Sequence, residues 1–245
     1  MSTFAPLIAV TGAELALAPR IGIDQSTASN WSGYAAVPSS GSVSSVSGSW
    51  IVPAVTGARR TTAYSSFWVG IDGYNSGTVE QIGTDSDIQN GKATYYAWFE
   101  FYPNPAYKLL RFPVSPGDKI SASVTYSSGT FTVSITDITT RKTFSTSSTV
   151  PTAARTSAEW IAEAPWSNGV LPLANFGQVT FSSCTASVGG ISQTISSFGP
   201  MTAATSGTGY DAITMTTSSG TVKAVPSGLD DTGAGFSVHW FNAGP

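Results

Sequence analysis

The stretch KISASVTYSSGTFTVSITDITTRKTFSTSSTV, residues 119–150, alternates apolar and small polar residues in three runs with two short turns between them. Alternation places every second side chain on one face of an extended strand, so each run predicts a β-strand with one buried and one solvent-facing side. The turns, at residues 127–129 and 139–142, are short enough to join neighbouring antiparallel strands. This stretch therefore predicts a β-meander.

Similar short runs continue on both sides of the meander, from Asn30 to the C-terminus. They are separated by Gly, Ser, Pro and Asn, and Asn90–Gly91 is the strongest hairpin signal among them. Roughly a dozen strands result, which favours an all-β sandwich of two packed antiparallel sheets over a single small barrel. One run, TSAEWIAEA at residues 156–164, also fits a helical turn by propensity, and the sequence leaves both interpretations open.

Residues 1–29 lack this strand-and-turn rhythm. We interpret them as an N-terminal extension or pro-segment remnant, or as an arm packed on the sandwich, and we expect the β-sandwich domain to occupy residues 30–245. The N-terminus has no basic region ahead of its apolar residues, so it does not resemble a signal peptide. No apolar run approaches the roughly 20 residues that span a bilayer, and we expect no membrane partner.

Only 10% of the residues are charged, and the net charge is −3 with a pI of about 5.0. The 11 basic residues are scattered, which leaves no cationic stripe for a phosphate backbone and argues against nucleic-acid binding. Low charge density also limits self-repulsion when carboxylates become protonated, a property that suits an acidic medium. Cys184 is the only cysteine and His239 the only histidine, so an internal disulfide is excluded, and we interpret both residues as structural.

Several runs gather aromatic and acidic side chains on one face of their strands. Alternation places the following residues on those faces: Trp68, Gly70 and Asp72; Val79, Gln81, Gly83 and Asp85; Tyr96, Trp98, Glu100 and Tyr102; and Glu159, Ile161 and Glu163. Aromatic rings beside carboxylates on one sheet face could form a groove for an extended polymer. A solvated face with incidental tryptophans would show the same pattern, and alternation does not separate the two.

Five segments, in this order along the chain, resemble the glutamic peptidases of the eqolisin, or peptidase G1, family. They are NWSGY (30–34), WVGIDG (68–73), EQIGTD (80–85), YYAWFEFYP (95–103) and RTSAEWIAE (155–163). The Gln in the context Q-x-G-x-D and the Glu in the context R-T-x-A-E-[aromatic]-I are the most specific parts. The resemblance runs from about residue 30 to the C-terminus.

The resemblance implies a sandwich of two large, bent antiparallel sheets, concanavalin A-like or jelly-roll-like, with Gln81 and Glu159 as the catalytic pair. It also implies a substrate groove that is lined or braced by Trp68, Asp72, Asp85, Trp98 and Glu100. We therefore expect a secreted, acid-acting endopeptidase that is a monomer, cuts unfolded or extended polypeptides, and needs no cofactor or metal. Fungal members carry disulfides, so this chain is more similar to a disulfide-free, bacterial-type member.

A Gln–Glu pair is chemically competent for amide hydrolysis in acid. A Glu can transfer protons in both directions, and a Gln amide can stabilise the oxyanion and hold the attacking water without titrating. If Glu159 acts first as a base, activity in strong acid requires hydrogen bonds that lower its pKa. If it starts protonated, it acts first as an acid. The sequence does not decide between the two orders, and we favour the base-first one.

A carbohydrate-active β-sandwich is the alternative function. Glu100 and Glu159 could serve as the acid and nucleophile of a glycoside hydrolase, or the groove tryptophans could serve a lectin-like module. The first leaves Gln81 without a role, and the second leaves Glu159 without one. The run at residues 85–91 is one residue out of step with an EF-hand loop, and we expect no metal there.

Overall fold

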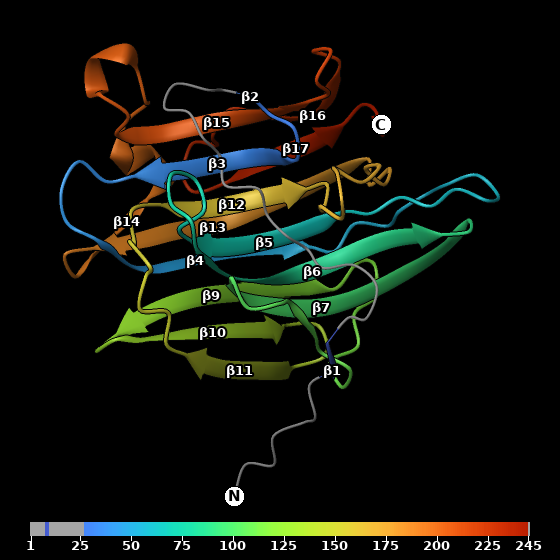
Figure 1. Ribbon diagram of the computed structural model, residues 1–245, viewed down its shortest axis with the longest axis horizontal. Helices are drawn as coiled ribbons and strands as arrows, with labels where there is room; N and C mark the ends of the chain where they lie inside the picture. Colours follow the sequence, from blue (N-terminus) through green and yellow to red (C-terminus); the bar gives the residue numbers. More distant parts are fainter. Residues whose placement is uncertain (1–7, 10–26, 245) are drawn as a thin grey trace, which may run out of the picture.

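The computed structural model describes residues 8–9 and 27–244, which are almost entirely β-strands (Figure 1). In sheet A the strands lie in the spatial order β15 (Gly209–Thr216), β3 (Trp31–Val37), β12 (Ala158–Glu163), β5 (Ser66–Ile71), β6 (Val79–Gln89), β7 (Lys92–Tyr102), β8 (Tyr107–Lys108) and β1 (Ile8–Ala9). All of these neighbours pair antiparallel. The long hairpin β6–β7 contains the Asn90–Gly91 turn that the sequence predicts.

Sheet B begins with the predicted meander. Its strands lie in the order β11 (Lys142–Ser148), β10 (Thr130–Asp137), β9 (Lys119–Ser127), β4 (Val43–Ile51) and β13 (Gln178–Val188). Strand β13 then pairs with β14 (Ile191–Thr194) at its C-terminal end and with β17 (Phe236–Trp240) at its N-terminal end, and β17 pairs with β16 (Val222–Pro226). Strand β15 pairs with β3 of sheet A and with β16 of sheet B, so it connects the two sheets. The short strand β2 (Thr27–Ala28) lies parallel to β15.

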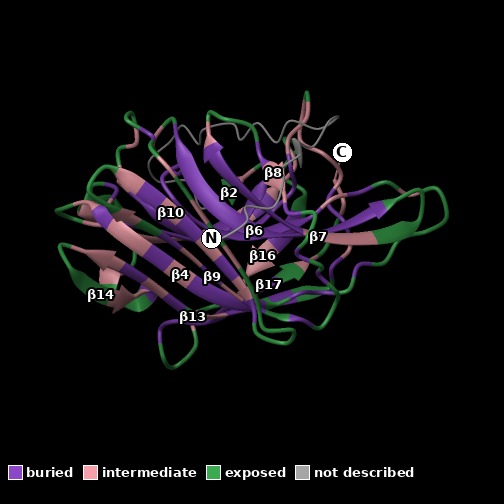
Figure 2. Ribbon diagram, turned by 90° about the horizontal axis from the view of Figure 1, so that it is seen from below, coloured by how far each residue is buried: buried purple, intermediate pink, exposed green. Residues whose placement is uncertain are grey.

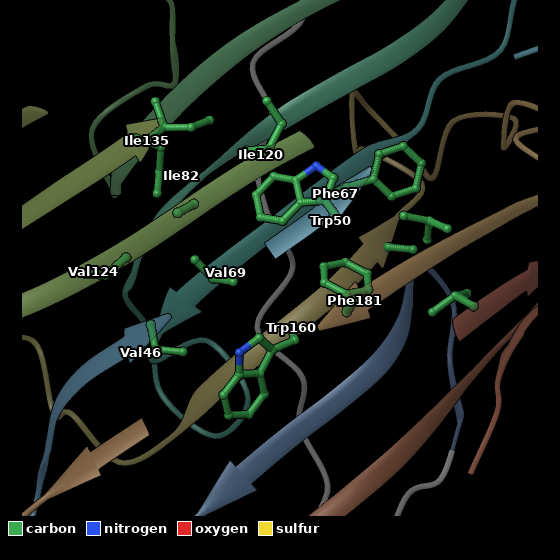
Figure 3. Close-up of a cluster of buried hydrophobic side chains, with 14 of the residues drawn as sticks. Val46, Trp50, Phe67, Val69, Ile82, Ile120, Val124, Ile135, Trp160 and Phe181 are labelled. Carbon is green, nitrogen blue, oxygen red and sulfur yellow. The ribbon is translucent and has the colours of Figure 1, made fainter. Parts of the chain in front are cut away.

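The main hydrophobic core lies between the two sheets, where the apolar side chains of the alternating strands in sheet A pack against those in sheet B (Figure 3). Two buried tryptophans also connect the layers by hydrogen bonds. The Trp50 indole N–H of sheet B donates to Thr84 Oγ1 of sheet A at 2.9 Å, and the Trp160 indole N–H of sheet A donates to the Ser47 carbonyl of sheet B at 2.8 Å. Each tryptophan thus buries a large ring without leaving its polar atom unsatisfied.

The outer face of sheet B carries rows of hydroxyl groups. Cross-strand register aligns two such rows over five strands: Ser147, Thr132, Thr125, Ser45 and Ser187 in one, and Ser145, Ser134, Ser123, Ser47 and Thr185 in the other. Figure 2 shows the resulting alternation of buried and intermediate residues along β4 and β10. Neighbouring hydroxyls lie 2.9 Å apart at three of these pairings, between β10 and β11 and between β4 and β13.

The predicted all-β sandwich is confirmed, with some differences in detail. Seventeen strands lie in the described residues rather than about a dozen, because β1, β2 and β8 have two residues each and carry no recognisable alternation. The run 156–164 forms a strand and not a helical turn. Strand β14 ends at Thr194, where a 3₁₀ helix, Ile195–Phe198, begins; a second 3₁₀ helix covers Ala203–Thr205.

The proposed division at residue 30 stays a prediction, because most of residues 1–29 lies outside the described residues. Within the described part of the chain, no helix is long and apolar enough to cross a membrane.

Candidate active site

The candidate site lies on the outer face of sheet A, where directly paired residues of neighbouring strands point to the same side. Register defines three rows that run from β3 across β12, β5 and β6 to β7. Row 1 is Ala35, Glu159, Gly70, Gln81 and Glu100; row 2 is Gly33, Ile161, Trp68, Gly83 and Trp98; row 3 is Trp31, Glu163, Ser66, Asp85 and Tyr96. Six of the seven predicted site residues lie in these rows; Asp72 does not.

Gln81 and Glu159 are brought together by the strand between them. Both pair directly with Gly70 of β5, from opposite sides. A Cβ atom at Gly70 would lie 2.9 Å from Cζ3 of Trp68 and 3.3 Å from Cβ of Gln81. Glycine at position 70 therefore lets the Trp68 ring and the Gln81 side chain pack closely against β5, between the two strands that carry Gln81 and Glu159.

The side-chain amide of Gln81 is hydrogen-bonded through its nitrogen but not through its oxygen. Its Nε2 donates to Glu100 Oε2 at 2.7 Å, whereas its Oε1 is buried and has no hydrogen-bond partner among the described residues. Burial raises the pKa of Glu100 to about 8, although the hydrogen bond from Gln81 opposes the shift. Glu100 is therefore neutral in acid and fixes the orientation of the Gln81 amide.

Glu159 is fully buried, and neither carboxyl oxygen has a hydrogen-bond partner among the described residues. Burial raises its pKa well above the ordinary value; the nearby Ser157 hydroxyl lowers it, the charges of Asp72 and Glu80 raise it further, and the Tyr74 backbone N–H lowers it. The base-first order requires a lowered pKa, and that condition is not met. Desolvation outweighs the local donors, so Glu159 is a neutral acid at low pH.

Asp72 braces the site from behind and does not line it. Its carboxylate accepts the backbone N–H groups of Arg155 at 2.6 Å and Thr156 at 2.9 Å, and its own N–H donates to the Ser157 carbonyl at 3.0 Å. These bonds join the end of β5 to the segment that enters β12 ahead of Glu159. Asp72 thus connects the end of β5 to the segment that leads into the strand carrying Glu159.

Trp68 forms the centre of row 2 and connects it to row 3. Its indole N–H donates to Glu163 Oε2 at 2.7 Å, and Asn30 donates to the other oxygen of Glu163 at 3.2 Å. The Trp31 ring meets the Trp68 ring edge-on, with centroids 5.0 Å apart. The indole N–H groups of Trp31 and Trp98 are buried without a hydrogen-bond partner among the described residues, and they are donors that a bound chain could use.

Asp85 belongs to a proton-sharing group at the far end of the rows. Tyr96 Oη lies 2.7 Å from Asp85 Oδ2 and 3.2 Å from Asp87 Oδ2, and Ser66 donates to the other oxygen of Asp85 at 2.6 Å. A phenol has one proton, so it can donate to only one of the two carboxyls. Burial raises the pKa of Asp85 to about 6 and that of Asp87 well above its usual range, with the charge of Asp85 adding to the latter shift. Asp87 therefore keeps the second proton in acid.

Sequence reasoning missed several residues of this face. Glu163 and Tyr96 share a face with predicted residues, so alternation carried the signal, whereas Trp31 gave no sign of its partners. Asp211 of β15 pairs directly with Ala35 and extends row 1, but nothing in its own sequence context singles it out. The EF-hand-like run lies in the β6–β7 hairpin, and no cluster of three metal-ligating side chains occurs in the described parts of the chain.

Row 1 offers a neutral acid and an amide with a free carbonyl oxygen, on the two strands that flank Gly70. Such a set can hold a water molecule and exchange protons with a polarised carbonyl group. Rows 2 and 3 add aromatic walls and indole donors alongside. The arrangement therefore suits hydrolysis of an extended chain more than proton transfer in a small closed pocket.

Comparison with known proteins points to the same chemistry. The model of the Peptidase A4 family matches residues 29–225. The chain is 34% identical over 189 residues to Aspergillopepsin-2 of Aspergillus niger, a match that covers 66% of this chain and 65% of the relative. It is 36% identical over 141 residues to Scytalidopepsin B of Scytalidium lignicola, covering 55% of this chain and 51% of the relative. The matches thus span less than two thirds of either curated relative.

Solved structures agree over a larger share of both chains. Scytalido-glutamic peptidase with a peptide-based transition-state analogue superposes with a TM-score of 0.71 at 26% identity, covering 87% of this chain and 98% of that one. The aspergilloglutamic peptidase from Aspergillus niger superposes with a TM-score of 0.61 at 28% identity, covering 73% and 99%.

Proposed function

The chain belongs to the Peptidase A4 family, and from that premise we propose that it is an acid-acting endopeptidase with Gln81 and Glu159 as its catalytic pair. The substrate is an extended polypeptide laid across rows 1 to 3. The observation that carries the proposal is the placement of both side chains on either side of Gly70, with their unpartnered oxygens in a single row. The similarity to a peptidase that binds a peptide-based transition-state analogue supports this substrate class.

The raised pKa of Glu159 favours a mechanism that starts from the neutral acid. Gln81 Oε1 holds the attacking water, and the carbonyl oxygen of the Glu159 carboxyl accepts a proton from it. The hydroxyl of the same carboxyl gives its proton to the substrate carbonyl oxygen, so the scissile carbon becomes a neutral diol. Collapse of the diol breaks the C–N bond, with a proton passed through Glu159 to the leaving nitrogen, and Glu159 ends protonated.

This order fixes the sign of the pH dependence. The reactive form is protonated Glu159, so activity is fully present at low pH and is lost as the pH rises through the pKa of Glu159. Glu100 supports the same window, because its carboxyl, with a pKa near 8, carries no charge beside Gln81 in acid.

The arrangement of the carboxyls argues against the carbohydrate-active alternative. Glu100 and Glu159 are three strand spacings apart, roughly 14 Å between backbones, and Gln81 lies on a strand between them. Glu100 is also bound to Gln81. A glycosidase would leave the best-placed amide of the site without a role, and we do not retain that function.

The test compares Glu159→Gln and Gln81→Ala with wild type on acid-denatured protein and on a soluble glucan across pH 2–7, in the presence of an aspartic-protease inhibitor. We expect wild type to cut protein alone and to ignore the inhibitor. Glu159→Gln is expected to lose at least about a thousandfold in kcat, and Gln81→Ala to lose kcat more than KM changes. Asp231→Asn and Gln178→Ala, on the exposed surface, are matched controls. Near-normal turnover by Glu159→Gln refutes the assignment.

Secretion and a monomeric state are further parts of the proposal. Secretion into an acidic medium is supported by the low charge density and by the neutral form that the buried carboxyls take in acid.

A further inference from the structure

The surface of this protein carries a different balance of charge from the whole chain. Among the described residues, the only acidic side chains that escape burial are Asp211, Asp230 and Asp231. The described arginines and lysines are mostly exposed, and Lys223 is the only one of them that is buried. The net charge of −3 thus arises from carboxyl groups in the interior, and the described surface presents more basic than acidic groups.

The fold brings three of the exposed basic residues together at the tip of the β6–β7 hairpin. Lys92 begins β7, and Arg59 and Arg60 belong to the loop of residues 57–62, which packs against the tip. The Gly91 N–H donates to a carbonyl group of this loop at 2.8 Å, and a Cβ atom at Gly91 would lie 3.0 Å from Cα of Arg59. Glycine therefore permits the close contact between loop and hairpin. We call Arg59, Arg60 and Lys92 the basic tip.

The loop is fixed to the hairpin as an extension of sheet A. Ala63 and Ile88 exchange backbone hydrogen bonds at 2.9 and 2.8 Å, in line with the pairing of β5 with β6. Figure 1 shows the hairpin protruding beyond the neighbouring strands. No acidic residue occurs in the segments that form the tip, 56–63 and 88–95, so their basic side chains have no counter-charge nearby in the sequence.

The basic tip lies at the end of the groove face. Alternation along β7 places Lys92 on the same face as Tyr96 and Trp98. Beyond row 3, two further pairs of β6 and β7 continue this face, and the second of them is Gln89 with Lys92. Lys108 of β8 lies beside row 3, with its Nζ 3.8 Å from the centroid of the Tyr96 ring. Positive groups are thus present from row 3 outward to the tip.

We propose that the basic tip is a secondary binding site for an acidic stretch of the polypeptide substrate. The inference rests on the proposed function, in which the substrate crosses rows 1 to 3. A chain laid in that direction runs along the strands and continues toward the tip. Gln89 lies about eight residues, or roughly 26 Å, beyond Gln81 on β6, so the acidic stretch lies about eight residues from the scissile bond. Guanidinium and ammonium groups attract carboxylates, which gives the partner its chemistry.

The charge of the substrate fixes the pH dependence of this contact. Aspartate and glutamate side chains of an unfolded chain titrate near pH 4, whereas guanidinium and ammonium groups keep their charge throughout the acidic range. The elements around the tip contribute the titratable side chains of Asp87, Tyr64 and Tyr95. Burial raises the pKa of Asp87 well above its usual range, so this carboxyl stays neutral in acid, and phenols carry no charge there. The attraction is therefore present at pH 5 and lost at pH 2.5.

The experiment compares peptides that share one cleavage segment and differ in a tail of four glutamates or four glutamines. The tail starts about eight residues from the cleaved bond, on either side of it, and kcat and KM are measured at pH 5 and 2.5. We expect wild type to prefer the glutamate tail about tenfold in kcat/KM at pH 5, through KM. The preference should vanish at pH 2.5, and at pH 5 it should weaken in 0.5 M NaCl.

Two triple variants separate the tip from the overall charge. The change Arg59→Gln/Arg60→Gln/Lys92→Gln should abolish the preference for the glutamate tail. The matched control removes the same number of exposed positive charges from the beginning of β9 and the β10–β11 turn, and it should keep the preference; it is Lys119→Gln/Arg141→Gln/Lys142→Gln.

The proposal is overturned if wild type shows no preference, or if the preference persists in the tip variant or at pH 2.5. An equal loss in the control variant also overturns it, because the charge of the whole molecule then attracts the substrate. Fluorescence anisotropy with a glutamate-tailed peptide whose cleaved bond is a reduced amide measures binding without turnover. If Glu159→Gln retains activity, the proposed function fails. Roughly tenfold weaker binding by the tip variant then still supports the secondary site, and unchanged binding refutes both.

Discussion

The conversion of Glu80 to glutamine tests whether buried carboxyls make this fold dependent on acid. Glu80 pairs with Ile71 and Phe101 of the core, is fully buried, and has no hydrogen-bond partner for either oxygen within the described residues. Burial, with a smaller contribution from the charge of Asp72, raises its pKa from 4.5 to about 9. The folded protein therefore binds this proton more tightly than the unfolded chain does.

The sign and size of the effect follow from that difference. Below pH 4.5 Glu80 is protonated in both states and does not lower the free energy of unfolding. As the pH rises from 4.5 toward 9 the free energy of unfolding falls, because only the unfolded chain releases this proton in that range. Between pH 4.5 and 7.5 the loss is three pH units at 1.36 kcal/mol each, about 4 kcal/mol. That is a large part of the roughly 5–15 kcal/mol that stabilises a typical domain. Glutamine has nearly the same shape and never ionises.

The assay is urea unfolding followed by tryptophan fluorescence at pH 4.5 and 7.5. We expect Glu80→Gln and wild type to be nearly equal at pH 4.5, and the variant to be more stable by about 4 kcal/mol at pH 7.5. The matched control is Asp231→Asn, at an exposed carboxyl, which should follow wild type at both pH values. Equal losses of stability in Glu80→Gln and wild type between the two pH values would refute the reasoning.

Two further substitutions test the geometry of the rows. Gly70→Ala places a methyl group 2.9 Å from the Trp68 ring and 3.3 Å from Gln81, so it displaces the Gln81 side chain, and kcat should fall at least about tenfold while the circular dichroism stays unchanged. A wild-type kcat would contradict the close packing of Gln81 at this position. Trp68→Phe removes the 2.7 Å donor to Glu163 but keeps a ring, and we expect a loss of about 1–3 kcal/mol in the free energy of unfolding by urea titration at pH 4.5, an expectation that unchanged stability would rule out.

Sequence patterns predicted the faces of the strands better than the contacts made across them. Alternation in YYAWFEFY placed Ala97, Phe99 and Phe101 toward the core and Trp98 and Glu100 on the groove face, as the structure has them. This works because a strand assigns its side chains to faces locally, one residue after another.

Contacts that depend on the path of the whole chain could not be predicted in this way. The hydrogen bond from the Tyr74 hydroxyl to Asp211 joins residues 137 positions apart, and it exists only because β15 is the neighbour of β3. The protonation of Glu159 was misjudged for a related reason. Its pKa depends on burial, which the whole fold produces, and no pattern in the sequence shows how deeply this side chain lies. The choice of Gln81 and Glu159 among several polar residues came from family resemblance.

The hydroxyl rows on sheet B bear on how the molecule behaves as a colloid. Serine and threonine hydroxyls do not titrate in the range where the carboxyls change charge, so the hydration of this face stays constant as the medium is acidified. At the isoelectric point of the folded protein, where the net electrostatic repulsion between molecules vanishes, this broad face stays hydrated without any charge. The protein should therefore lose little solubility at its isoelectric point. At high salt concentration, we expect the molecules to associate through other faces than this one.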